Sequence, residues 1–267
     1  LDIYLSGEVT RIAQEGPIPI IKETSNKYIL GGAGFVALNC KNMNFDVTIC
    51  SLVGYDHESN KIIELLTSKK IKSKIFRELS YTTTTKKRVS ANNTYTARID
   101  RESSAFNFRN FNKVIEYLEK KIHAFDTIII SDYAKGFIVR PDLIIKLANK
   151  YKIPILIDPK GLDFQKYKYS TTITPNLSEF ESVVGNIKNK SDLIKKGLSL
   201  KKKLVLKFLV VTMAEKGAMV IDENNKIYFF QNQVREVRNI VGAGDVFISS
   251  LACSLSLYNN VIFAARF

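Results

Sequence analysis

The chain has 267 residues, 45% of them apolar, and its 40 Lys and Arg against 26 Asp and Glu give a net charge of +14. This length can bury one large core and fits a single α/β domain. No run reaches the roughly 18 apolar residues of a membrane-spanning helix, so we expect no membrane association.

The positive charge suggests a nucleic-acid ligand, but the rest of the composition argues against one. The lysines are spread along most of the chain, and the run Lys201-Lys202-Lys203 lies beside an apolar strand candidate. The sequence has no Trp, and it shows no recognisable RNA-binding aromatic motif. We therefore expect no nucleic-acid partner and assign the charge to anionic small substrates.

The cysteines and histidines do not follow a metal-binding or triad pattern. Cys40, Cys50 and Cys253 are an odd number without metal-ligand spacing, as expected for thiols of a reducing compartment such as the cytoplasm. His57 and His123 lie far apart in the chain. A zinc site or a Ser/His/Asp triad is not expected.

The first elements alternate between strands and helices. Residues 17–22 predict an edge strand with proline near its entry. The glycine-rich turn at 31–34 leads into a helix over 35–40, where a ligand could approach the backbone closely. Residues 47–53 predict a buried strand, and a helix follows at 62–66.

Residues 74–100 differ from their surroundings. They contain four consecutive threonines at 82–85 and strand-favouring runs on both sides of Asn92-Asn93, which suits a hairpin. The alternating polarity predicts a sheet that covers a site. We expect this segment and residues 15–30 to form a β-flap, or lid.

From residue 122 onward a strand is followed by a helix several times. Expected strands cover 126–131, 154–158, 171–174 and 203–211, expected helices cover 141–150 and 177–184, and a hairpin joins 218–221 to 226–230. This alternation predicts a mostly parallel central sheet with helices on both faces.

Polar residues gather where these strands end. They are Asp132, Asp158, Lys160, Asn176, Glu179 and Thr212. In an open parallel sheet, ligands bind outside the carboxyl ends of the strands, so these side chains predict the site.

The segment Gly242-Ala243-Gly244-Asp245 precedes an apolar run with small residues at helical spacing. A glycine turn before a helix leaves backbone N–H groups open to an anion, and the helix dipole adds to the attraction. Asp245 stands where a base could orient an attacking hydroxyl. A tight turn with an acidic first-turn residue is the simpler interpretation of this motif.

Four motifs together resemble the ribokinase/PfkB sugar-kinase superfamily. They are Ser131 to Gly136, Ile157 to Gly161, Thr174 to Glu181, and Gly242 to Asp245. Within this superfamily the chain looks like the D-glycero-β-D-manno-heptose-7-phosphate kinases, which form the kinase domain of bifunctional heptose kinase/adenylyltransferases. The similarity runs over nearly the whole chain.

The resemblance implies a ribokinase-like α/β fold for one domain, residues 1–267, and a cytoplasmic enzyme. It implies transfer of the ATP γ-phosphoryl group to the anomeric hydroxyl of heptose 7-phosphate, for lipopolysaccharide core synthesis, with Mg²⁺ as cofactor. It also implies a homodimer formed through the lid. The chain starts without Met and lacks the family's adenine-side segment, so we expect it to be truncated at both ends.

The resemblance also implies roles for individual residues. Asp245 would be the catalytic base, and the anion hole would be Gly242, Ala243 and Gly244. ATP would contact Asn176, Leu177, Ser178, Glu179, Thr212 and Gly217, with Mg²⁺ held by Glu179 through water. The sugar phosphate would contact Asp2, Gly31, Gly32, Arg88, Asp132 and Lys135.

Two internal positions depart from the family pattern. Phe35 stands where the family usually has Asn, and Asn239-Ile240-Val241 replaces Asp-x-Thr. Each change removes polar groups, and a lost polar contact typically costs about 1–3 kcal/mol. Two alternatives therefore stay open: a decayed nucleotide-binding pseudokinase, and a kinase of another sugar on the same fold.

Overall fold

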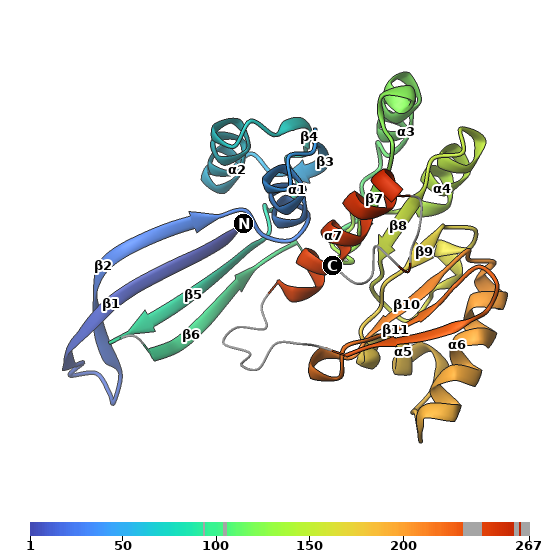
Figure 1. Ribbon diagram of the computed structural model, residues 1–267. Helices are drawn as coiled ribbons and strands as arrows, with labels where there is room; N and C mark the ends of the chain where they lie inside the picture. Colours follow the sequence, from blue (N-terminus) through green and yellow to red (C-terminus); the bar gives the residue numbers. More distant parts are fainter. Residues whose placement is uncertain (93, 104–105, 232–241, 259–261, 263–267) are drawn as a thin grey trace. The chain divides into compact units, whose positions relative to one another are not determined.

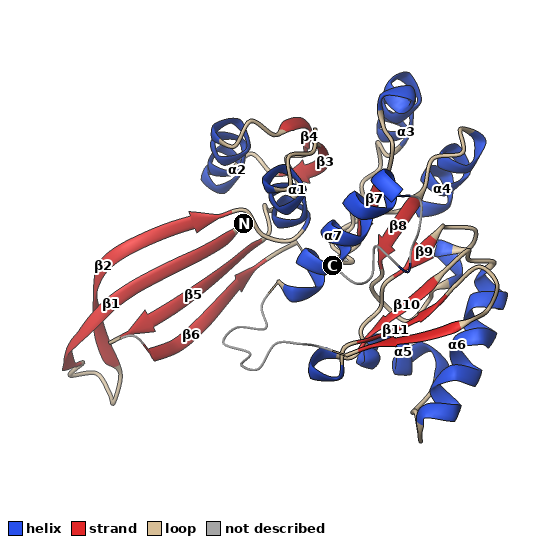
Figure 2. Cartoon of the chain, in the orientation of Figure 1, coloured by secondary structure: helices blue, strands red, loops and turns tan. Residues whose placement is uncertain are grey.

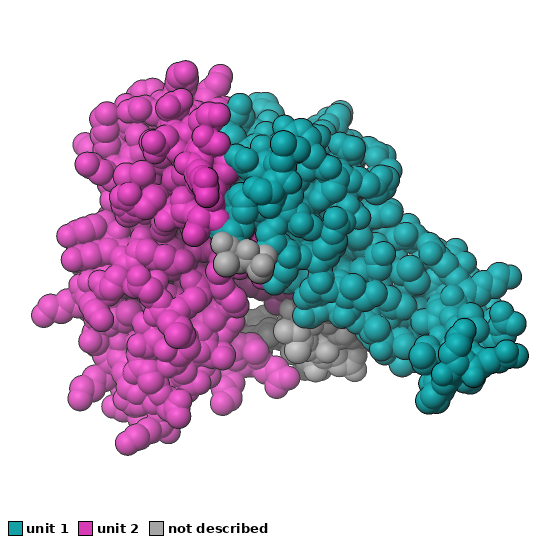
Figure 3. Space-filling view, turned by 180° about the vertical axis from the view of Figure 1, so that it is seen from behind, with its two compact units in different colours: residues 1–41, 46–106 teal, residues 42–45, 107–267 magenta. Residues whose placement is uncertain are grey.

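The computed structural model describes residues 1–92, 94–103, 106–231, 242–258 and 262. The chain divides into two compact units (Figure 3). The first contains residues 1–41 and 46–106, and the second contains residues 42–45 and 107–267. Each unit has its own sheets, and one functional domain over residues 1–267 stays a prediction.

A four-stranded sheet forms one part of the first unit (Figure 1). Its order is β2-β1-β5-β6, from β1 (Asp2–Ile12), β2 (Pro19–Ile29), β5 (Thr85–Ala91) and β6 (Thr94–Arg101). β1 runs antiparallel to β2 and parallel to β5, and β6 is exposed along its whole length. This sheet contains most of the two segments expected to form the lid.

The sheet differs from the sequence expectation at two places. β1 was not expected, and it supplies a central strand between β2 and β5. Residues 74–77, assigned to the flap, lie in β4 (Lys72–Arg77), which pairs in parallel with β3 (Thr48–Val53) instead. The structure places Ile75 against an apolar core instead, and β4 pairs with the buried strand β3.

That core lies between β3, β4 and two helices, α1 (Ala33–Asn42) and α2 (His57–Ser68). Its buried members are Leu30, Ala37, Ile49, Leu66 and Ile71. α2 begins at a capped N-terminus, where Asp56 Oδ1 accepts from the Ser59 N–H at 3.0 Å. Both expected helices of this region are therefore present, and each is longer than its apolar run indicated.

The second unit contains two three-stranded sheets that meet edge to edge. β7 (Ile128–Ser131), β8 (Ile155–Asp158) and β9 (Thr172–Ile173) are parallel, whereas β10 (Leu209–Thr212), β11 (Ala218–Ile221) and β12 (Ile227–Phe230) are antiparallel. The Phe208 N–H donates to Thr171 O and the Thr212 N–H to Pro175 O, both at 3.0 Å. These bonds align β10 parallel to β9 and continue the sheet.

Helices lie on both sides of this sheet (Figure 2). They are α3 (Asn112–Lys121), α4 (Pro141–Lys150), α5 (Leu177–Val184), α6 (Lys190–Leu204) and α7 (Ala243–Tyr258). α7 contacts β7 and β8, whereas α6 packs on β11 at Gly197, where an added Cβ would lie 2.8 Å from Ile221 Cδ1. The central strands are fully buried, with Leu156, Ile173 and Val210 at 0% exposure. The expected α/β fold with a mostly parallel sheet is confirmed.

None of the helices in the described ranges is long and apolar enough to cross a membrane.

Candidate functional site

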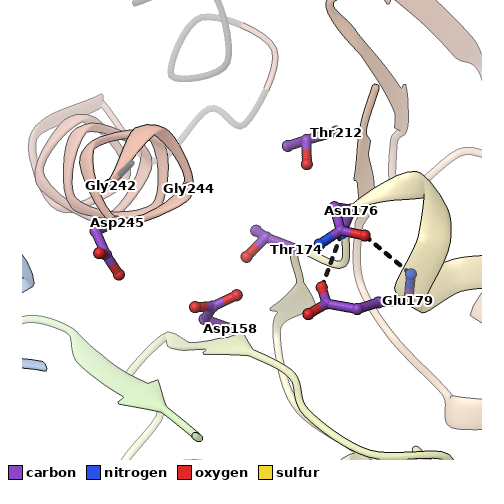
Figure 4. A pocket seen from close by; sticks show the side chains of 8 residues that line it. All are labelled: Asp158, Thr174, Asn176, Glu179, Thr212, Gly242, Gly244 and Asp245. Atoms are coloured by element: carbon purple, nitrogen blue, oxygen red, sulfur yellow. Dashed lines mark hydrogen bonds between the residues drawn. The ribbon is translucent and has the colours of Figure 1, made fainter. Parts of the chain in front are cut away.

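A pocket in the second unit lies where strands β8, β9 and β10 end (Figure 4). It is lined by Asp158, Thr174, Asn176, Glu179, Thr212, Gly242, Gly244 and Asp245. Figure 4 shows Asp245 and Asp158 pointing toward each other, with Asn176 and Glu179 on the opposite wall. The sheet therefore brings together residues that are up to 87 positions apart in sequence, from Asp158 to Asp245.

The N-terminus of α7 forms one wall of this pocket. Gly242 has φ +87°, a left-handed conformation that glycine adopts without strain, and its carbonyl accepts from the Val246 N–H at 2.9 Å. Among the described residues outside its own helix, no atom lies within 4 Å of an added Cβ at Gly244, so these residues leave the approach to the helix end open. The free N–H groups and the dipole of a 16-residue helix make this wall attractive to an anion.

Asp245 lies in the first turn of α7 and faces the end of β7. The Tyr133 hydroxyl donates a hydrogen bond to Asp245 Oδ1 at 2.5 Å. Burial, and then the charge of Asp245, raise the pKa of Tyr133 far above its ordinary value. Tyr133 therefore stays a neutral donor, and the bond has the short length of a charge-assisted O–H···O⁻ contact.

Asp158, at the end of β8, has a carboxyl group with a strongly raised pKa. Burial, followed by the negative charges of Glu179 and Asp245, raises the pKa of Asp158 to about 7. Lys160 opposes this shift, and Asp132 adds to it. Such a concentration of negative groups is a site for a cation or for proton transfer.

The N-terminus of α5 forms the opposite wall. Asn176 Oδ1 accepts from the Glu179 N–H at 2.9 Å, and Glu179 Oε2 accepts from the Asn176 N–H at 3.1 Å, which completes a capping box. Glu179 Oε1 also accepts from Lys160 Nζ at 2.8 Å. Both walls of the pocket are therefore helix N-termini.

Asp132, expected to contact the sugar, is only 3% exposed. Its Oδ2 accepts from the Tyr167 hydroxyl at 2.6 Å and from Lys166 Nζ at 2.8 Å, and its Oδ1 accepts from the Ala134 N–H at 2.7 Å. These contacts hold the segment that follows β7, next to Tyr133. Contact of Asp132 or of the half-buried Lys135 with a sugar stays a prediction.

The remaining residues expected at the sugar lie together in the first unit. Arg88 Nη1 is 3.1 Å from Asp2 Oδ1, and an added Cβ at Gly31 would be 2.8 Å from Asp2 Oδ2. Gly32 has φ +52° and its carbonyl accepts from the Val36 N–H at the start of α1. Arg88 Nη1 is buried and has no well-aligned hydrogen-bond acceptor among the described residues. A buried guanidinium in this state suits an anionic ligand.

Other expected contacts are near the pocket but do not line it. Leu177, Ser178 and Ala243 occupy the first turns of α5 and α7, and Gly217, at φ +83°, lies in the turn between β10 and β11. Their expected roles stay predictions.

Of the family departures, only Phe35 is described. It is half-buried in the first turn of α1 and is not part of the buried core. Asn239, Ile240, Val241 and residues 263–267 lie outside the described residues.

Two pocket residues, Asp158 and Thr174, and the Asp245 partner Tyr133 were not assigned roles from the sequence. Asp158 was noted at a strand end, but its raised pKa depends on neighbours that only the fold supplies. Thr174 lines the pocket directly after β9. Tyr133 lies within a recognised motif, yet nothing in a sequence indicates that an aromatic residue points at a carboxylate 112 positions away.

The pocket also suits Mg²⁺ held together with phosphates. Within the described parts of the chain no group of three or more acidic, His or Cys side chains forms a complete metal cage. Mg²⁺ usually keeps several waters and takes only one or two carboxylates besides substrate phosphates. Glu179, beside an anion-attracting helix end, fits that mode of binding.

The comparisons with known proteins agree with this geometry. The sequence profile of the pfkB family of carbohydrate kinases matches residues 2–267. The chain belongs to this family and is an ATP-dependent sugar kinase. Among curated proteins it is similar to the bifunctional protein HldE of Histophilus somni, with 36% identity over 256 residues. The match covers 96% of this chain and 54% of that protein, so the chain spans about half the length of the curated relatives it matches.

Solved structures show the same fold. The tetrameric inhibited form of phosphofructokinase-2 from Escherichia coli superimposes with a TM-score of 0.81 at 18% identity, covering 100% of this chain and 87% of that one. Arabidopsis thaliana ribokinase complexed with ribose and ATP gives a TM-score of 0.74 at 15% identity, covering 99% and 86%. The expected ribokinase-like fold is confirmed.

Proposed function

We propose that this chain phosphorylates D-glycero-β-D-manno-heptose 7-phosphate at its anomeric hydroxyl, with ATP as donor, to give the 1,7-bisphosphate. The observation that carries the proposal is the pocket that joins Asp245 and the α7 N-terminus to the Asn176–Glu179 wall. The similarity to HldE over 96% of the chain supports a heptose as the sugar. This reaction belongs to ADP-heptose and lipopolysaccharide core synthesis.

The chemistry follows from the residues of the pocket. Asp245 accepts the proton of the attacking hydroxyl, and the N–H groups at Gly242 to Gly244 stabilise the charge on the transferred phosphoryl group. Asn176, Glu179 and Thr212 position the ATP phosphates. Mg²⁺, when bound at Glu179 through water, neutralises phosphate charge. Phosphoryl transfer needs mainly positioning and charge stabilisation, and these groups supply both.

The sugar phosphate is assigned to Asp2, Gly31, Gly32 and Arg88. A guanidinium binds a phosphate with two parallel hydrogen bonds, and Arg88 is a largely buried guanidinium with five N–H donors, of which Nη1 already faces Asp2 Oδ1 at 3.1 Å. We assign the reaction to the cytoplasm, where ATP is available. We further propose that the four-stranded sheet is a lid and that two copies pair through it, because its edge strand β6 is exposed and leaves Tyr95 and Ile99 65% and 56% exposed.

The test is ADP release by the purified chain with Mg²⁺ and ATP over a panel of heptose 7-phosphate, fructose 6-phosphate and ribose. We expect the highest kcat/KM for heptose 7-phosphate. Asp245→Asn should lower kcat by about 10²–10⁴ while ATP affinity changes little. A preference for another panel sugar would move the assignment to that sugar. ATP binding without sugar-dependent ADP release would identify a pseudokinase.

A further inference from the structure

Tyr133 makes a short hydrogen bond to the proposed base. Its hydroxyl donates to Asp245 Oδ1 at 2.5 Å, from the segment that follows β7 to the first turn of α7. Tyr133 is itself half-buried and stays protonated, because burial and Asp245 raise its pKa. A side chain held in this way offers one donor in a fixed direction.

The segment that carries Tyr133 is held in place by the hydrogen bonds of its neighbour Asp132. Next to it, the buried Asp132 carboxylate accepts from Tyr167, Lys166 and the Ala134 N–H. Three hydrogen bonds to one buried carboxylate leave this residue little freedom, and Tyr133 is its direct neighbour in the chain. The Tyr133 hydroxyl is therefore placed by the fold and not by Asp245 alone.

Asp245 needs such a donor because the surrounding charge is unfavourable for a carboxylate. Asp158 lies at the end of β8, Asp132 directly follows β7, and Glu179 lies on α5. After burial, the negative charges of Glu179, Asp245 and Asp132 raise the pKa of Asp158, so these carboxylates repel one another across the pocket. Two lysines face these carboxylates, and each is already paired: Lys160 Nζ with Glu179 and Lys166 Nζ with Asp132, both at 2.8 Å. A neutral hydroxyl stabilises an ionised carboxylate without introducing a cation that would compete for phosphate.

We propose that Tyr133 is a positioning residue for the phosphoryl-transfer base: its hydroxyl fixes the orientation of the Asp245 carboxylate and keeps it ionised in an acidic pocket. This inference rests on the proposed role of Asp245. It adds that the Tyr133 hydroxyl helps to set the pH at which kcat/KM falls on the acid side, where Asp245 becomes protonated.

The test compares Tyr133→Phe with a matched control, Tyr228→Phe. Tyr228 lies in β12 with its hydroxyl 3.5 Å from Asp222 Oδ2, so it is also a tyrosine beside a carboxylate, but it is not a pocket residue. We expect Tyr133→Phe to lower kcat about 10- to 100-fold with little change in the KM for ATP. The acid limb of its kcat/KM profile should move up by about one pH unit. Tyr228→Phe should change neither quantity.

A double variant separates this inference from the base assignment. If Tyr133 acts through Asp245, then Tyr133→Phe in an Asp245→Asn background should change kcat by less than about twofold. If Tyr133→Phe acted only by destabilising the protein, its loss of kcat would add to the loss caused by Asp245→Asn. The double variant therefore distinguishes the two explanations even if Tyr133→Phe lowers Tm. A Tyr133→Phe enzyme with wild-type kcat and an unmoved acid limb overturns the inference. An Asp245→Asn enzyme with near-wild-type turnover overturns the base assignment itself.

Discussion

The Arg88 guanidinium lies 3.1 Å from the Asp2 carboxylate, between the neighbouring parallel strands β5 and β1. The side chains are 11% and 19% exposed, and the carboxylate also faces Gly31 closely. Water screens this pair less than it screens a surface ion pair. A change in either residue should therefore alter the affinity for a ligand that binds beside them.

Gly31→Ala should weaken sugar-phosphate binding without unfolding the protein. Its Cβ would lie 2.8 Å from Asp2 Oδ2 and 2.9 Å from Asp2 Cγ, so the carboxylate has to turn away while the backbone stays in place. We expect a rise in the KM for the sugar phosphate of about tenfold, the size of one lost polar contact. Gly16→Ala is the matched control, because no atom lies within 4 Å of its Cβ. An unchanged KM for both variants would remove Gly31 and Asp2 from the proposed sugar site.

Arg88→Ala should raise the KM for the phosphorylated sugar more than the KM for ATP. The reason is that the Arg88 guanidinium is largely buried and has more N–H donors than its pairing with Asp2 uses, so it can also bind a phosphate. Arg98→Ala provides the comparison, since Arg98 is 59% exposed and pairs with Asp100 on the same lid sheet. A surface pair of this kind contributes little. Steady-state kinetics of both variants decide: equal losses for the two substrates in Arg88→Ala would indicate a structural role.

Asp158→Asn should change stability in a pH-dependent way. The pKa of Asp158 is about 7 in the folded protein against an ordinary 3.8, so folding favours its protonated form. That contribution is complete below about pH 3.8 and is lost as the pH rises through 7. At pH 8 the neutral Asn variant should therefore be more stable than the wild type, by on the order of 2 kcal/mol, and at pH 4 the difference should vanish.

Urea unfolding at the two pH values measures this difference. Asp126→Asn, at an exposed position of the same unit, should show no change with pH. An Asp158→Asn protein that is destabilised equally at both pH values would mean that the folded state needs the ionised carboxylate.

The fold was predictable where the apolar pattern is regular. The buried strands β8 and β10 and the short helices α4 and α5 follow from runs bounded by Pro, Asn and Thr. α6 (Lys190–Leu204) was missed because its lysines obscure the apolar positions Leu193, Leu200 and Leu204, which lie on one face. Lys201 on that face is 6% exposed and reaches Asn225 Oδ1 at 2.8 Å, a contact that no sequence pattern indicates.

The site was predictable to the extent that topology alone places it. The rule that ligands bind at the carboxyl ends of parallel strands grouped Asp158, Asn176, Glu179 and Thr212, which line one pocket, whereas Asp245 of that pocket was expected only from its glycine turn. The same rule could not show that Asp132 is buried and accepts three hydrogen bonds, or that the Tyr133 hydroxyl points at Asp245. Both depend on residues distant in sequence, Tyr167 and Lys166 for Asp132 and Asp245 for Tyr133.

The two residues of the capping box at the start of α5 serve both the stability of the helix and the pocket. Asn176 and Glu179 satisfy each other's backbone N–H groups and also line the pocket, and Glu179 holds Lys160 as well. A mutation that removes either polar group therefore lowers helix stability by about 1 kcal/mol in addition to any loss of ligand contact. Selection for folding alone would therefore keep this pair of residues even in a lineage that had stopped using the enzyme.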